Sequence, residues 1–189
     1  MVFKPRFFIA LLPPPNLQKE INQIKQHFAD HYNSKKAFNA PSHITIFPPF
    51  LWPEEDTPRL ETHLEQFAQN TPQLPIILSG FGAFKPRVIF IHPEKTPELV
   101  TLHQHLNDYL QTHLSLQDEK AKTRPFAPHI TVAFRDLSKS NFKAAWPHFK
   151  DQSFDHQFTV SQLTLLRHNG RHWEIYHNLP FQREHKPVS

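Results

Sequence analysis

The chain contains no cysteine and only 3 glycines among its 189 residues. Without cysteine it can form no disulfide, no thiolate nucleophile and no cysteine-ligated zinc or iron–sulfur site. So few glycines leave no phosphate-binding loop of the ATPase type, no dinucleotide-binding fingerprint and no serine elbow of the hydrolase type. Catalysis must therefore come from other groups, and ATP-driven ligation has no support in the sequence.

Long apolar runs are also missing from the sequence. A membrane-spanning helix needs about 20 apolar residues in a row, and no segment approaches that length. The apolar stretch at residues 7–12 follows Lys4 and Arg6, but prolines at 13–15 interrupt it and no small-residue cleavage site follows. This stretch is typical of a first strand and not of a secretion signal, so we expect a soluble, cytoplasmic protein.

Aromatic, proline and basic residues are abundant instead. The 18 phenylalanines and a hydrophobic share of 38% indicate a folded core, and the length suits one domain of two lobes over residues 1–189. A net charge of +4 and a pI near 9.4 favour anionic partners such as phosphates or RNA. A mildly basic protein without such a partner is the alternative.

Apolar periodicity predicts alternating strands and helices. Residues 6–13 are typical of a buried strand, and apolar residues from Leu17 to Phe28 recur at helical spacing. The same reasoning predicts helices from Thr57 and over 97–114, strands over 73–84 and 87–93, a loop over 118–128, a helix over 137–149 broken by Pro147, and two strand-like runs over 158–181 around Asn169-Gly170. The alternation in two halves of the chain predicts a pseudo-duplicated α+β domain.

One short pattern occurs twice, in the stretches "SHITIFPPF" and "FAPHITVAF". Successive strand residues point to opposite faces, so His43 and Thr45 share one face while the aliphatic residues between and after them share the other. The same holds for His129 and Thr131. Each strand therefore presents an imidazole beside a hydroxyl, and the two strands could face a common cleft.

The repetition exceeds what chance supplies. Composition alone accounts for one His-x-Thr, but two copies with aliphatic residues at both neighbouring positions are expected only about one time in a hundred. A third pattern, "HLSL", contains His113 and Ser115, but it continues a helical leucine stripe that would place these two residues far apart around the helix. We therefore exclude it.

These residues resemble the two-histidine phosphoesterases, in particular the 2′-5′ RNA ligase and RNA 2′,3′-cyclic phosphodiesterase group. Supporting similarity lies in "RFFIALLPP", "GAFKPRVIFI" and "LLRHNGRHWEIYHNLPF". The resemblance implies a bilobal α+β fold with a pseudo-twofold axis, in which two small antiparallel sheets flank a central groove and helices lie outside. It also implies RNA ends, oligonucleotides and cyclic nucleotides as partners, a monomeric protein, and no membrane, metal or cofactor.

The residue types suit the opening of a 2′,3′-cyclic phosphate. Two histidines with ordinary pKa values near 6.5 can act as general base and general acid close to neutral pH. The hydroxyls of Thr45 and Thr131 would donate hydrogen bonds to the phosphate oxygens. The resemblance implies that His129 activates water and that His43 protonates the departing 3′-oxygen, although the sequence alone leaves the two roles interchangeable.

Two positions depart from the family pattern. Many members carry a basic residue five positions after the second histidine, where this chain has Phe134. Arg135 follows and shares the face of His129 if the strand stays regular, so it is a candidate for binding the substrate. Phe47 falls on the face of His43 by the same rule, where it could stack on a base, and a core position is the alternative.

Other readings remain open. His27 and His31 are helical neighbours that could hold a metal, but no third ligand accompanies them. Lys120, Lys122 and Arg124 could reach an RNA backbone or form a solvated loop. The substrate could also be a 2′-5′ linkage, cleaved or joined reversibly, or a cyclic phosphate of ADP-ribose. From another class, the protein could be an RNA-binding module without turnover.

Overall fold

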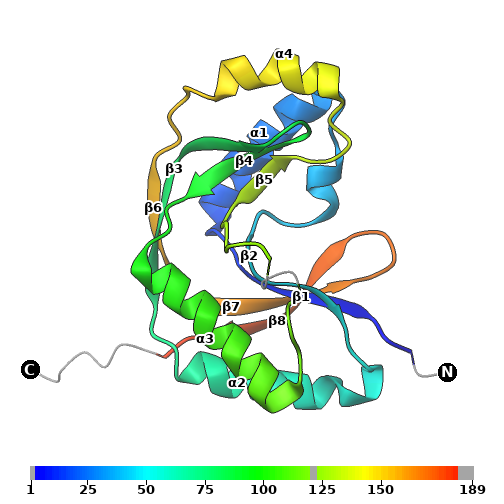
Figure 1. Cartoon of the computed structure of the whole chain (residues 1–189), viewed down its shortest axis with the longest axis vertical. Coiled ribbons are helices and arrows are strands. Elements are labelled where there is room, and N and C mark those ends of the chain that lie inside the picture. The colour runs from blue at the N-terminus through cyan, green and yellow to red at the C-terminus, as the bar shows by residue number, and fades with distance from the viewer. Residues whose placement is uncertain (1–2, 120–122, 183–189) are drawn as a thin grey trace, which may run out of the picture.

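The chain folds into two four-stranded antiparallel sheets with α-helices around them (Figure 1), in a computed structural model that describes residues 3–119 and 123–182. The first sheet has the order β2-β1-β7-β8, with bounds β1 Arg6–Leu11, β2 Ile44–Leu51, β7 Gln162–His168 and β8 Trp173–Pro180. The second has the order β5-β4-β3-β6, with bounds β3 Leu74–Phe84, β4 Val88–Pro93, β5 Ile130–Ala133 and β6 His156–Val160. The predicted α+β architecture with two small antiparallel sheets is confirmed.

Four α-helices in the described residues cover the sheets: α1 Pro15–Tyr32, α2 Thr57–Gln69, α3 Pro97–Leu114 and α4 Lys139–Phe149. Helices α2 and α3 lie against the first sheet, while α1 and α4 lie beside the second (Figure 1). Helix α1 therefore leaves the first sheet at β1 and packs against β5 of the second, and α3 leaves the second sheet at β4 and packs against β2 of the first. This exchange of helices joins the two sheets.

The alternation of elements had predicted that each lobe is built from one half of the sequence. The structure shows that this prediction is wrong. The first sheet combines strands from both ends of the chain, and the second is built from the middle. The run over residues 158–168 had been predicted as one strand, but it divides at Ser161 into β6 of the second sheet and β7 of the first. Hydrophobic patterning does not reveal this, because it reports burial and not the pairing partner.

Helix α4 continues through Pro147, which the sequence analysis had expected to break it. The Ser138 side chain caps the helix by accepting a hydrogen bond from the Asn141 amide at 3.1 Å. Pro147 removes one amide donor, but it lies in the last turn and the helix ends at Phe149. Burial of the stripe that includes Phe142 and Phe149 outweighs this loss.

Each sheet has a core face and an open face. Along β1, Phe7, Ile9 and Leu11 are fully buried in the main core with the apolar stripes of α2 and α3. The intervening Phe8 and Ala10 point to the opposite face, where they form a small separate cluster. No helix in residues 3–119 and 123–182 combines the length and apolar character that a membrane crossing requires.

Candidate active site

The two His-Ile-Thr motifs lie on the edge strands of opposite sheets. His43 directly precedes β2, and Thr45 is the second residue of that strand. His129 and Thr131 have the same relation to β5. All four side chains are half-buried, and all four line one cavity of about 640 Å³. The structure therefore brings the two motifs together in a common cleft.

The cleft has two branches that meet at the motifs. We call the 640 Å³ cavity the α1 branch; it also contains Lys25, Lys36 and Trp173. An adjoining cavity of about 790 Å³, the hairpin branch, is lined by the turn between β3 and β4 and by Phe126. Residues common to both branches are Thr45, His129, Thr131, Phe134 and Arg135. A ligand centred on the motifs would thus have space on either side.

Both motif histidines are oriented by the same backbone contact. The Nδ1 of His43 lies 2.7 Å from the carbonyl oxygen of Pro41, and the Nδ1 of His129 lies 2.8 Å from that of Ala127. Because a carbonyl can only accept, each Nδ1 carries the proton, and the neutral ring has its lone pair on Nε2. Within the described part of the chain no protein group bonds to either Nε2. Each histidine is therefore ready to accept a proton from a ligand or from water.

The protein environment disfavours protonation of both rings. Burial lowers the pKa of His43 to about 4, and the positive charges of Lys25 and protonated His129 add to this effect while the bond to Pro41 opposes it. Burial also lowers the pKa of His129, while its bond to Ala127 raises it. Burial thus favours the neutral form of both rings in the unliganded protein. An anion bound between them would raise both pKa values.

The same β-bulge follows both motifs. Thr45 pairs with Ala10 and Phe47 with Ile9, so Ile46 is an extra residue in β2. In β5, Thr131 pairs with Phe90 and Ala133 with Ile89, so Val132 is extra in the same way. After each threonine, two successive residues therefore enter the core, and strand alternation fails at this point.

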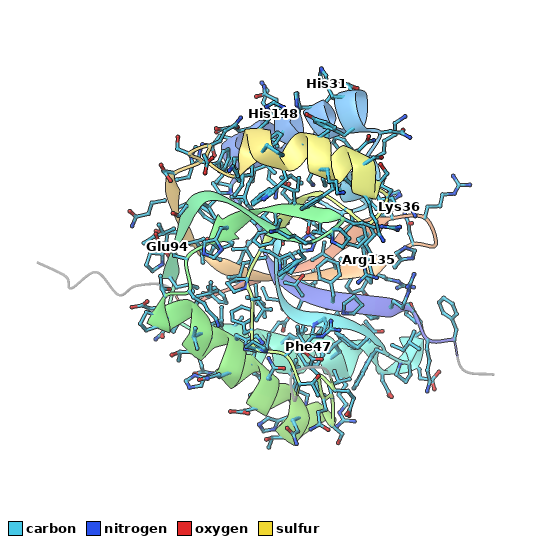
Figure 2. The ribbon with its side chains drawn as sticks, turned by 45° about the horizontal axis from the view of Figure 1, so that its top comes forward. His31, Lys36, Phe47, Glu94, Arg135 and His148 are labelled. Atoms are coloured by element: carbon cyan, nitrogen blue, oxygen red, sulfur yellow. The ribbon has the colours of Figure 1, made fainter. Side chains whose placement is uncertain are left out.

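Phe47 is the residue that this bulge moves. Strand alternation had predicted it on the face of His43, but its side chain is 1% exposed and belongs to the main core. Phe47 is labelled in Figure 2, and the next residue, Pro48, lines the hairpin branch instead. The placement of Phe47 in the substrate-binding face is therefore wrong, and the core alternative holds.

Arg135 does line the cleft, although not for the predicted reason. Strand β5 ends at Ala133, so alternation cannot be extended to Arg135. The side chain, labelled in Figure 2, is exposed, and its guanidinium lies 5.6 Å from the ring centre of Phe134. Both residues border both branches. A positive charge is therefore available beside the second motif.

Aromatic residues surround the histidines. The ring of Phe8 is centred 4.8 Å from that of His43, and Trp173 contacts Phe8 edge-on at 4.7 Å. On the opposite sheet, Phe84 and Phe90 are centred 5.0 and 5.6 Å from His129. These apolar walls account for the desolvation of both imidazoles. Their placement depends on sheet pairing, which the sequence does not display.

Gly82 makes room for one of these walls. It pairs with Phe90 across β3 and β4, and a Cβ atom on Gly82 would overlap the Phe90 ring. A glycine inside a strand signals such a close approach, and this signal was present in the sequence. The position of Phe90 beside His129 therefore depends on Gly82 having no side chain.

Asp136 joins the two motifs through a hydrogen-bonded loop. Its carboxylate accepts from the Ser34 hydroxyl at 2.9 Å and from the amides of Lys35 and Lys36 at 2.7 and 2.9 Å. Ser34 Oγ in turn accepts from the Phe134 amide. Partial burial raises the pKa of Asp136, but these hydrogen bonds outweigh it and hold the pKa below the ordinary value. The chain that leads to His43 is thereby attached to the segment that follows His129.

The remaining candidates lie elsewhere. His27 and His31 stack at 4.2 Å on α1, on the side of the molecule where Figure 2 shows His31 and His148, away from Arg135. Over residues 3–119 and 123–182, no three His, Cys, Asp or Glu side chains are grouped to hold a metal ion. Arg124 lines the hairpin branch. Lys120 and Lys122 lie outside the described residues.

The chain is similar in sequence to known proteins over most of its length. The model of the 2′-5′ RNA ligase superfamily matches residues 13–172. The Geobacillus kaustophilus protein named "Putative phosphoesterase" is 29% identical over 175 residues, covering 90% of this chain and 93% of that protein. A Bacillus cytotoxicus protein, also named "Putative phosphoesterase", is 28% identical over 160 residues, covering 84% of this chain and 86% of that protein.

Solved structures share the fold over nearly the whole chain. A Thermus thermophilus protein superimposes with a TM-score of 0.70 at 20% identity, covering 95% of this chain and 100% of that one. E. coli LigT complexed with 3′-AMP superimposes with a TM-score of 0.64 at 20% identity, covering 96% and 100%. The arrangement of the two sheets is therefore one that other proteins also adopt.

We predict that Gly82→Ala displaces the Phe90 ring and thereby lowers any activity that depends on His129. The clash should also cost about 1–3 kcal/mol of stability. Urea unfolding of the single variants and of Gly82→Ala/Phe90→Ala would measure this. Gly82→Ala should be much less costly in the Phe90→Ala background, because the clashing ring is gone. Equal costs in both backgrounds would show that Gly82 does not position Phe90.

We predict that Asp136→Ala destabilises the protein by about 2 kcal/mol at neutral pH, because charged hydrogen bonds to three donors are lost. The folded pKa is depressed, so this contribution is present above the unfolded value near 3.9 and disappears as the pH falls through the folded pKa. Chemical denaturation across this range should show the wild type and variant converging in acid. A gap that persists unchanged in acid would contradict the assignment.

Proposed function

Because the chain belongs to the 2′-5′ RNA ligase superfamily, we propose that it opens 2′,3′-cyclic phosphates at RNA or nucleotide ends and leaves 2′-phosphomonoesters. The main support for this proposal is a pair of histidines that face one cleft from opposite sheets. Each is protonated on Nδ1 and lies beside a threonine. Structures of LigT complexed with 3′-AMP and with phosphate have this fold, which supports a phosphate ligand for the present cleft.

The proposed reaction adds one water molecule across a phosphorus–oxygen bond. One neutral histidine takes a proton from water at Nε2, and the water oxygen bonds to phosphorus. The bond between phosphorus and the ribose 3′-oxygen breaks, and the second histidine, which took up a proton on Nε2 when the anionic phosphate bound, donates that proton to the oxygen. The products are a 2′-monoester and a 3′-hydroxyl. The two histidines then exchange a proton with solvent and return to their starting states.

The threonines and Arg135 suit the charge that this reaction concentrates on phosphorus. In residues 3–119 and 123–182 no protein group hydrogen-bonds to the hydroxyl of Thr45 or Thr131, so each can donate to a non-bridging oxygen. Arg135 supplies a cation at the point where the two branches meet. Such donors stabilise the transition state when they are in place before the reaction. Binding in this cleft also replaces water around the phosphate.

The charge environment favours one division of the two roles. Burial lowers the pKa of both rings, and the Lys25 cation lowers that of His43 in addition, so a proton is less favourable on His43. His43 then acts as the base, and His129, which gains a proton more readily, acts as the acid. This is the reverse of the division that the family resemblance had implied.

A second substrate follows from the shape of the cleft. The hairpin branch and the α1 branch lie on either side of the motifs, with volumes of about 790 and 640 Å³. A 2′-5′ phosphodiester has a nucleoside on each side of its phosphorus, whereas a terminal cyclic phosphate has one on a single side. The two-branched cleft therefore supports reversible cleavage of a 2′-5′ linkage as the alternative reaction of the same histidines.

We predict that His43→Ala and His129→Ala each lower turnover about a hundredfold or more, because each removes a proton-transfer group. Phosphorus NMR in EDTA would follow a 2′,3′-cyclic nucleotide, a cyclic-phosphate-ended oligonucleotide and a 2′-5′ dinucleotide. His31→Ala, on the outer surface, is the matched control and should behave as wild type. If both motif variants retain more than a tenth of wild-type turnover, the mechanism is wrong. Salt-dependent RNA binding without any product would indicate a binding module.

A diester with a p-nitrophenolate leaving group separates the two roles, since p-nitrophenolate departs without needing a proton. We predict that His129→Ala keeps most of its activity on bis(p-nitrophenyl) phosphate, whereas His43→Ala loses it. Release of p-nitrophenolate measured by absorbance gives the two rates directly. The opposite result would restore His129 as the base.

A further inference from the structure

A buried lysine lies behind the first motif. Lys25, in the middle of α1, is only 1% exposed and is among the largest fully buried side chains described. Its ammonium donates to the Ala40 carbonyl at 3.3 Å and lies 5.9 Å from the ring centre of Phe38. Among the described residues no carboxylate pairs with it. One long hydrogen bond and one aromatic ring offset little of the desolvation free energy of a buried ammonium. Such a charge destabilises the folded protein unless a bound anion pairs with it.

Lys25 belongs to the same cavity as the first motif. It lines the α1 branch together with His43 and Thr45, and its charge acts on the His43 ring. Every titratable side chain that lines this branch is basic, and among the described residues no Asp or Glu borders it. The basic groups are Arg6 from β1, Lys25 from α1, Lys36 from the 3-10 turn before β2, Arg135 after β5, and the two motif histidines. Mutually repelling cations around one cavity are relieved by an anion.

A purely structural role explains Lys25 less well. The loop before His43 is already held by the Gln18 amide, which accepts from the Ser42 amide at 2.9 Å and donates to the Ser42 carbonyl at 2.6 Å. Gln18 lies two helical turns before Lys25 on the same face of α1. A loop anchor needs only a neutral donor, which would avoid the desolvation of a charge. The charge itself therefore requires another explanation.

We propose that Lys25 is a substrate-binding residue whose buried ammonium contacts the phosphate held between the motifs, from the His43 side. This inference rests on the proposed function, because it identifies the anion as the reacting phosphate. In the empty cleft the Lys25 charge helps to keep His43 neutral and ready to act as a base. When the phosphate binds, its negative charge stabilises the ammonium, and the protein takes up protons.

The test is phosphate binding to Lys25→Met, which removes the charge and keeps the length of the side chain. Calorimetry with inorganic phosphate should show affinity weakened about tenfold or more, because a desolvated charge pair is lost. Lys19→Met is the matched control, because Lys19 is exposed on the same helix and lines neither branch, and it should change affinity by less than about threefold. Lys25→Met should be at least as stable as wild type, because it relieves an uncompensated buried charge.

The pH dependence separates charge from structure. Burial lowers the pKa of Lys25 to about 8, so wild-type phosphate affinity should decline as the pH rises through this value, whereas Lys25→Met should lack that decline. Phosphate affinity within twofold of wild type and the same decline in Lys25→Met would overturn the proposal. If that variant does not fold, NMR of the Lys25 side chain in wild type decides, since phosphate should raise its pKa and an unchanged pKa would refute the contact.

The outcomes also distinguish this inference from the proposed function. A wild-type protein that binds phosphate through Lys25 but hydrolyses none of the phosphodiesters would retain the contact and reject the activity. A protein that hydrolyses cyclic phosphates with Lys25→Met unaltered in affinity and pH dependence would retain the activity and reject the contact.

Discussion

The hydrogen bond between each motif histidine and the carbonyl two residues before it is the constraint on which the site depends. The bonds of His43 to Pro41 and of His129 to Ala127 hold both protons on Nδ1 and leave both Nε2 atoms for chemistry. Without them, either tautomer could form and the rings could rotate. The apolar walls of the cleft lower the pKa of the rings and so favour their neutral form. The cleft is also lined by basic side chains, which favour binding of an anion.

The scaffold converts two local motifs into one site. Each motif lies on the free edge of a separate sheet, and the exchange of α1 and α3 between the sheets prevents the two edges from separating. Asp136 adds a direct link between the loop before the first motif and the end of the second. Rigid support of this kind holds the two histidines at a fixed separation, which the proposed acid–base catalysis requires.

Much of this was readable in the sequence, because it depended on local patterns. The paired motifs, the helix over 97–114 and the hairpin around Asn169 follow from residue spacing. The nested sheets, the bulge that buries Phe47 and the partners of Asp136 did not, since they depend on contacts between residues far apart in the chain. The burial of Lys25 was not predicted either, because a lysine on a helix is ordinarily exposed and its burial here depends on contacts with residues far along the chain.

Nitrogen-15 NMR of the histidine side chains tests the central claim most directly, because long-range couplings identify which ring nitrogen carries the proton. The account predicts that His43 and His129 are both neutral at pH 7 with the proton on Nδ1, and that inorganic phosphate raises the pKa of at least one of them. A proton on Nε2 of either ring in the free protein, or no response of either ring to phosphate, would contradict the account.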